Sequence, residues 1–197
     1  MKKVLFVLLI IVLMVSCTSM LPNNTKSEKN KDKYVTPYEY MAGIKPIGDN
    51  GVWLVKNYVD EFGNPTYNKY ISTSTIGAFS NSATNGSELY VEILVNKNNV
   101  EIELLEYGSY PISVIGSSAY INVKMSVFGE TIDVGEATFN KYTTSLTINN
   151  ALPVFKTLAE NSKVRMLITI DDFSLSKYLF DIDTAGFEYT YHEAFVK

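Results

Sequence analysis

The side chains that could carry out catalysis are few in this 197-residue chain. There is a single histidine, His192, and a serine–histidine–aspartate arrangement would have to use it. The sequence contains no G-x-S-x-G pattern, which would place a serine on the sharp turn that such enzymes use. Because nothing near His192 suggests a partner nucleophile, we expect it to be a partly exposed surface residue on a helix.

The acidic residues give two further candidates. The run Asp181–Gly186 (DIDTAG) begins like the calcium loop D-x-[DN]-x-[DN]-G-x₅-E. Its fifth and twelfth places hold Ala185 and His192, so two ligands are missing, and we expect a strand end that runs into a helix cap. Asp171–Asp172 is expected to form a turn at another strand end. A weak calcium site of another kind stays open. A glycosidase needs two carboxylates across a cleft, and the sequence does not place such a pair.

Cys17 is the only cysteine and follows an apolar run. Lys2 and Lys3 come first, then Val4–Val15 is unbroken by polar residues. Twelve residues suit the apolar region of a signal peptide and fall short of the roughly 17–25 that span a bilayer. We therefore predict a signal peptide over residues 1–16. An uncleaved anchor, or an ordinary signal with Cys17 merely nearby, are the alternatives.

The order Met14-Val15-Ser16-Cys17 resembles the lipobox of bacterial lipoproteins, with methionine where leucine is usual. The resemblance implies diacylglyceryl transfer to the Cys17 sulfur, cleavage before Cys17 and N-acylation. Each buried CH₂ of an acyl chain contributes about 0.8 kcal/mol, so two or more chains anchor a protein stably. Thr18 follows the cysteine instead of the aspartate that retains such proteins in the inner membrane of enteric-type bacteria. That favours the outer membrane, in a cell that has one.

Charge divides the remaining chain. Residues 17–33 are polar and rich in lysine, asparagine and serine, which predicts a disordered tether, with a net charge of +2 over residues 18–33. Residues 34–197 hold eleven basic and nineteen acidic side chains, a net charge of −8, and we expect them to form one domain. A basic tether suits an anionic lipid surface. An acidic domain with one arginine argues against nucleic acid as a partner.

Alternating apolar residues predict many short strands in residues 34–197. We place them at 52–59, 67–72, 75–80, 89–95, 100–105, 121–127, 131–138, 145–148, 163–170 and 175–182. Helices are expected from a cap at Asn149 or Asn150 to residue 160, and over residues 184–195, whereas residues 34–50 are expected to be extended. The predicted fold is mainly β: an antiparallel β-sandwich or partly open barrel with one or two short helices in the C-terminal half.

The runs WLVKNYVDEFGNPTYNKYI and GAFSNSATNGSELYVEILV resemble uncharacterised small β-rich bacterial envelope proteins. This resemblance implies no activity, so it gives no residue a role. The first run holds the lone tryptophan, Trp53, which we expect in the core. Fourteen tyrosines could form a face that binds glycan or peptide, although strand preference also accounts for them.

Taken together, the sequence predicts a lipid-anchored protein of the cell envelope, exported from the cytoplasm. We expect a binding or structural module without enzymatic activity, cofactor or metal, whose partner is an envelope protein or a glycan. The alternative is an anchored hydrolase with a carboxylate-based site.

Overall fold

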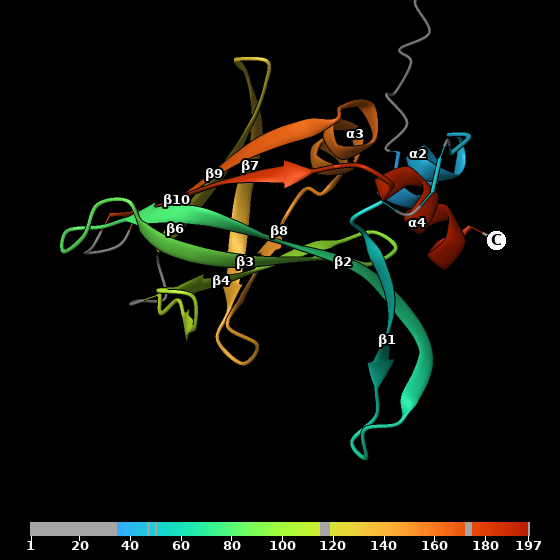
Figure 1. Ribbon diagram of the computed structural model, residues 1–197, viewed down its shortest axis with the longest axis horizontal. Coiled ribbons are helices and arrows are strands. Elements are labelled where there is room, and N and C mark those ends of the chain that lie inside the picture. The colour runs from blue at the N-terminus through green and yellow to red at the C-terminus, as the bar shows by residue number, and fades with distance from the viewer. Residues whose placement is uncertain (1–34, 47, 50, 115–118, 172–174, 197) are drawn as a thin grey trace, which may run out of the picture. The chain divides into compact units, whose positions relative to one another are not determined.

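The computed structural model describes residues 35–46, 48–49, 51–114, 119–171 and 175–196 (Figure 1). The strands are β1 (Leu54–Val59), β2 (Pro65–Ser80), β3 (Ser87–Val95), β4 (Val100–Glu106), β5 (Tyr110–Pro111), β6 (Tyr120–Val127), β7 (Glu130–Asn140), β8 (Ser145–Ile148), β9 (Lys163–Asp171) and β10 (Ser176–Asp183). The helices are α2 (Pro37–Ala42), α3 (Leu152–Glu160) and α4 (Phe187–Phe195). No helix in these ranges has the length and apolar character needed to cross a bilayer.

Eight of the strands form a closed antiparallel barrel. Their order is β2-β10-β9-β6-β7-β8-β4-β3, and pairing of β3 with β2 completes the ring. The prediction of a mainly β, antiparallel fold with short helices in the C-terminal half is confirmed. Each of the eight strands pairs with two neighbours, so the ring is closed and the sheet is a barrel, and the expectation of a sandwich or a partly open barrel is corrected on this point. Strands β1 and β5 lie outside the ring.

The barrel interior is apolar because its strands alternate as the sequence indicates. Along β4, the side chains of Val100, Ile102 and Leu104 are fully buried, while Glu101 and Glu103 lie on the outer face. Strands β3, β6 and β9 repeat the same period of two. Since successive side chains of a strand point to opposite faces, this period places every second residue in the core.

One end of the barrel carries the three helices, which contact one another (Figure 1). They bring together a cluster of aromatic rings. Phe187 of α4 lies 5.0 Å from Trp53 and 5.9 Å from Phe155 of α3, between ring centroids. Tyr191 packs 5.5 Å from Phe155. The expectation that Trp53 is a core residue is confirmed, since its side chain is fully buried.

Three local predictions are wrong. Residues 34–50 were expected to be extended, but they contain α2, whose Thr36 and Glu39 form a capping box around Pro37 at the first helical position. The two strands expected at 67–72 and 75–80 are one continuous strand, β2. Helix α3 begins after Ala151, with no side-chain cap from Asn149 or Asn150.

Candidate functional site

A hollow opens in the barrel wall where β6 and β7 part. The two strands pair from Val127–Glu130 to Asn122–Glu136. Beyond Glu136, β7 pairs with β8 instead, while the first residues of β6 pair only with β9. The space between the diverging strands is a hollow of about 990 Å³. That volume lies within the range of roughly 300–1,000 Å³ that is usual for ligand sites.

A β-bulge in β7 accompanies the divergence. The register shifts between the pairs Val123–Gly135 and Lys124–Asp133, so Val134 is an extra residue. Gly135 has a φ of 98°, which glycine adopts without strain, and its backbone N–H donates to the carboxylate of Asp133 at 3.1 Å. Because a bulge bends its strand and increases the local twist, it turns β7 away from β6.

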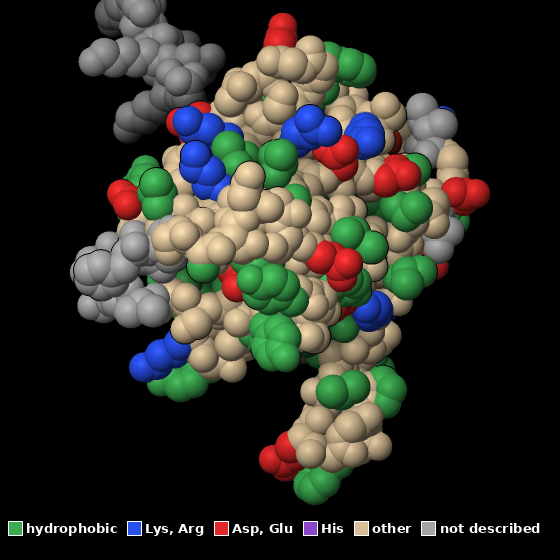
Figure 2. All heavy atoms as spheres, turned by 60° about the vertical axis from the view of Figure 1, so that its left-hand side comes forward, with side chains coloured by type: hydrophobic (Ala, Val, Ile, Leu, Met, Phe, Trp, Pro, Cys, Tyr) green, Lys and Arg blue, Asp and Glu red, His purple; other side chains and the backbone are tan. Residues whose placement is uncertain are grey.

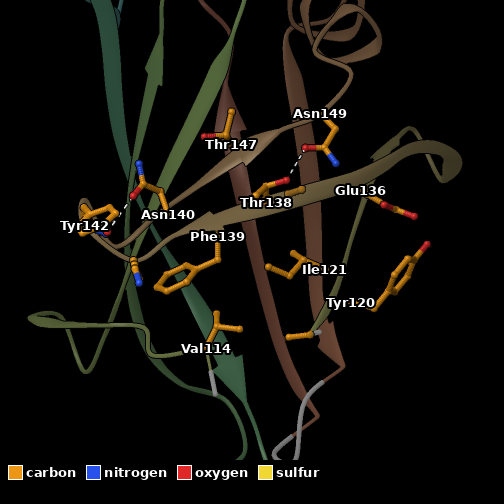
Figure 3. Close-up of a pocket in the computed structure, with 13 residues that line it drawn as sticks. Val114, Tyr120, Ile121, Glu136, Thr138, Phe139, Asn140, Tyr142, Thr147 and Asn149 are labelled. Atoms are coloured by element: carbon orange, nitrogen blue, oxygen red, sulfur yellow. Dashed lines mark hydrogen bonds between the residues drawn. The ribbon is translucent and has the colours of Figure 1, made fainter. Parts of the chain in front are cut away.

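The floor of the hollow is apolar. Ala137 and Phe139 point inward from β7, and Ile121 faces them from β6. Figure 3 shows the side chains of Phe139, Ile121 and Val114 converging below β7. An apolar floor gives a ligand area to bury, but it sets no orientation.

Polar groups on the outer faces of β7 and β8 form the rim. Thr138 Oγ1 donates to Asn149 Oδ1 at 2.8 Å, and Asn140 Oδ1 accepts the backbone N–H of Tyr142 at 2.9 Å (Figure 3). The backbone N–H of Asn149 also donates to the carbonyl oxygen of Glu136 at 3.0 Å, which ties the two strands together. With both amide oxygens engaged, the NH₂ groups of Asn140 and Asn149 are the donors that a ligand would meet.

Aromatic side chains flank the hollow. Tyr120 and Tyr142 are 50% and 87% exposed and lie on opposite sides of it in Figure 3. Lys141 Nζ lies 5.2 Å from the Tyr142 ring centroid, a cation–π contact. Glu136 is the single carboxylate among the described residues that line the hollow. The arrangement therefore offers two aromatic faces, an apolar floor, two amides, and one charge of each sign.

His192 does not lie at this site, and the expectation of a partly exposed histidine is wrong. Its side chain is buried between α4 and α2, where Nε2 donates to the carbonyl oxygen of Met41 at 2.7 Å. This hydrogen bond joins two residues that are 151 positions apart in the chain, and no local pattern predicts that their helices pack together. The role that the geometry assigns to His192 is structural.

The acidic candidates are also engaged elsewhere. Arg165 donates to both oxygens of Asp181 at 2.8 and 3.2 Å, and Lys163 Nζ lies 3.1 Å from it. The Arg165 guanidinium is the main reason that the pKa of Asp181 lies below its ordinary value. Asp183 accepts the backbone N–H of Ala185, as in a helix-entry turn. Asp171 is exposed at the end of β9, and Asp172 is outside the described residues.

The predicted lipid anchor lies outside this site. Cys17 and residues 1–34 lie outside the described residues, so the predicted anchor is not part of this geometry. The hollow was not predicted, although Gly135 within a strand pattern is a sign of a bulge. In the described ranges, no group of three or more histidine, cysteine, aspartate or glutamate side chains is placed to hold a metal ion.

The chain matches no known family model, no curated protein and no solved structure.

Proposed function

We propose that the chain is a lipid-anchored protein of the bacterial cell envelope whose barrel binds a glycan without transforming it. The observation that carries the proposal is the lining of the hollow between β6 and β7. It combines exposed tyrosine rings with outward-facing amides and hydroxyls over an apolar floor.

A neutral sugar has the complementary chemistry. The C–H face of a sugar ring is apolar and packs on aromatic side chains such as Tyr120 and Tyr142, while its hydroxyls both donate and accept hydrogen bonds. The NH₂ groups of Asn140 and Asn149 supply donors. The Thr138 hydroxyl, whose hydrogen is bonded to Asn149, supplies an acceptor, and the Thr147 hydroxyl can donate or accept. Two aromatic residues on opposite sides of a polar rim suit a chain of several sugar units better than a small compact ligand.

The alternative of an anchored hydrolase draws less support from this site. Glycoside hydrolysis uses two carboxylates, separated by roughly 5–9.5 Å depending on the mechanism. The described lining of the hollow contributes one, Glu136, on its exposed rim. A single solvated carboxylate supplies one of the two carboxylates that glycoside hydrolysis requires. The geometry therefore favours binding without catalysis.

The anchored location rests on the residues around Cys17. In this proposal Cys17 carries the acyl chains, residues 18–33 form a polar tether with a net charge of +2 beside the membrane, and the acidic barrel is held off the anionic surface. In a cell with an outer membrane, that membrane is its destination. The barrel would then hold an envelope glycan near the membrane to which Cys17 is attached.

Replacing Phe139 or Tyr120 by alanine is expected to weaken glycan binding about tenfold, since a buried aromatic contact commonly supplies more than 1 kcal/mol. Isothermal titration of the purified protein with cellotetraose, maltotetraose and N-acetylchitotetraose measures the effect. Tyr110→Ala is the matched control, because Tyr110 is exposed on β5 and does not line the hollow. Absence of binding to all three at millimolar concentration, or equal losses in the control, would refute the proposed site.

Replacing Cys17 by alanine is expected to abolish lipidation and to release the protein from the membrane fraction. The reason is that Cys17 supplies the only thiol to which a diacylglyceryl group could be attached. Metabolic labelling with palmitate and fractionation of the cells measure both effects. Ser16→Ala keeps a small residue before the cleavage site and is expected to behave as the unmodified chain. Unchanged labelling and membrane association of Cys17→Ala would count against the anchor.

A further inference from the structure

Strand β1 has one long edge that no other strand in the described part of the chain covers. It pairs with β2 on one side only and stands outside the ring of the barrel. Figures 1 and 2 show the β1–β2 ribbon projecting from the body of the barrel, and Figure 2 shows hydrophobic side chains on this projection. An uncovered edge presents backbone N–H and C=O groups to which a further strand can bind.

The hydrogen bonds of the turn between β1 and β2 show which residues face this open edge. The backbone N–H of Asp60 donates to the carbonyl oxygen of Asn64 at 2.9 Å, so Asp60 directs its backbone groups toward β2. Because successive residues of a strand direct these groups to alternate sides, Val55, Asn57 and Val59 direct theirs away from β2. No turn, loop or side-chain hydrogen bond among the described residues uses the backbone groups of these three.

The edge of β1 lacks the features that usually keep an edge strand from pairing. Strand β1 contains no proline, and the register shift between Asn57 and Val59 comes from extra residues in β2, so β1 itself is regular. Its one charged side chain, Lys56, is paired with Glu92, whose carboxylate lies 3.0 Å from Nζ. Leu54 and Val59 are 53% and 63% exposed. The edge is therefore both regular and largely apolar.

Contacts with β2 hold the side chains along this edge in place. Asn57 Nδ2 donates to the carbonyl oxygen of Thr66 at 2.6 Å. The ring of Tyr58 packs on that of Tyr70, with 4.7 Å between centroids. Groups that are fixed before binding lose less entropy when a partner arrives.

A second copy of the chain has an edge that complements this one. In an antiparallel pairing about a two-fold axis at Asn57, that residue faces its own copy and Val55 faces Val59. All three outward residues then form hydrogen-bonded pairs, which give about six main-chain hydrogen bonds. On the other face of the strand, Lys56 lies opposite Tyr58, so no like charges meet. Protein interfaces usually carry about 10 ± 5 direct hydrogen bonds, so this number suits a weak, reversible dimer.

We propose that the open edge of β1 pairs with the same edge of a second copy of this chain, antiparallel about a two-fold axis at Asn57. The same surface then serves both copies, as in other two-fold dimers. The β1–β2 ribbons of the two copies form one four-stranded sheet outside the barrels. This interface is separate from the glycan hollow between β6 and β7 and does not depend on it.

Oxidative cross-linking of the full chain, purified in detergent micelles, tests the register. The two Cα atoms of a hydrogen-bonded pair lie about 5.5 Å apart, within the roughly 4.4–6.8 Å that a disulfide spans. Asn57→Cys is therefore expected to form at least tenfold more disulfide-linked dimer than Phe62→Cys, measured on non-reducing gels. Phe62 is 81% exposed, so random collision would favour it, but it would lie roughly 30 Å from its own copy. The unmodified chain measures the background from Cys17.

A proline on the open edge tests whether main-chain hydrogen bonds hold the dimer. Val59 lies opposite Pro65 and directs its N–H away from β2, so Val59→Pro removes no hydrogen bond to β2. Adding Val59→Pro to Asn57→Cys is expected to lower the yield of cross-linked dimer at least tenfold. Adding Val59→Thr instead keeps the N–H and the branched shape, and is expected to change the yield less than twofold. Circular dichroism and the fluorescence of Trp53 check the fold of each variant.

Two results would overturn the proposal. The first is equal cross-linking of Asn57→Cys and Phe62→Cys, which would mean that the chains meet by collision and not in this register. The second is an unchanged yield with Val59→Pro in a folded variant, which would mean that the strand edges do not bond. If Asn57→Cys lost the fold, a mixture of Val55→Cys and Val59→Cys chains would test the same register, since those residues face each other in it. Absence of cross-linked dimer in that mixture would count against the pairing equally.

Discussion

Replacing Phe187 by alanine is expected to lower the free energy of unfolding by about 3–5 kcal/mol, the usual cost of removing a buried phenylalanine ring. Phe187 is 1% exposed and is the residue on which the aromatic cluster converges, since its ring contacts Trp53, Phe155 and Tyr191. Removing its ring leaves a cavity between α3, α4 and the segment before β1. The backbone of these three elements cannot move together to fill it. Equilibrium denaturation in urea, followed by the fluorescence of Trp53, measures the change.

Phe62→Ala is the matched control for this prediction. Phe62 lies in the turn between β1 and β2 and is 81% exposed, so the same chemical change removes almost no buried area. We expect a change within about 0.5 kcal/mol, as for surface substitutions in general. Similar losses in the two variants would show that the cluster around Phe187 does not hold the helices on the barrel.

The strands were predictable wherever the signal is local. The alternation of Val100, Ile102 and Leu104 with glutamates is visible within the seven residues of β4, and the structure confirms the predicted strand. Closure of the ring was not predictable, because it depends on β2 pairing with both β3 and β10, which follow it at very different distances along the chain. Hydrophobic period identifies the face that a strand buries, but it does not identify the neighbours of that strand.

The same distinction between local and long-range signals applies to individual residues. A capping box at Thr36 and Glu39 was readable from four consecutive residues and was missed because the prolines and glycines around it suggested an extended segment. The burial of His192 was not readable, since it follows from contact with Met41 across the whole domain. The hollow itself arises where β7 exchanges one partner for another. Local sequence marks that place only by the bulge at Gly135.

Replacing Gly77 by valine is expected to lower the free energy of unfolding by about 3 kcal/mol, at the upper end of what overpacking costs. Gly77 pairs with Leu89 of β3 on one side and with Phe180 of β10 on the other, so it stands at the point where the ring closes. A Cβ there would lie 2.5 Å from the carbonyl oxygen of Leu179 and 2.7 Å from the Cβ of Phe180. These atoms belong to the paired strand and yield only if β2 and β10 separate.

The expected damage is local, and hydrogen exchange can distinguish it from general destabilisation. Amides in the four pairs between Gly77–Phe180 and Ser80–Lys177 should exchange faster in Gly77→Val, while those of the β6–β9 ladder should keep more of their protection. Ser74→Val places the same side chain on the exposed face of the same strand and is expected to change stability by less than about 0.5 kcal/mol. If Gly77→Val were as stable as Ser74→Val, the close approach of β2 and β10 could not be what requires glycine. If hydrogen exchange became equally faster in the β2–β10 and β6–β9 ladders, the two parts of the barrel would instead open as one unit.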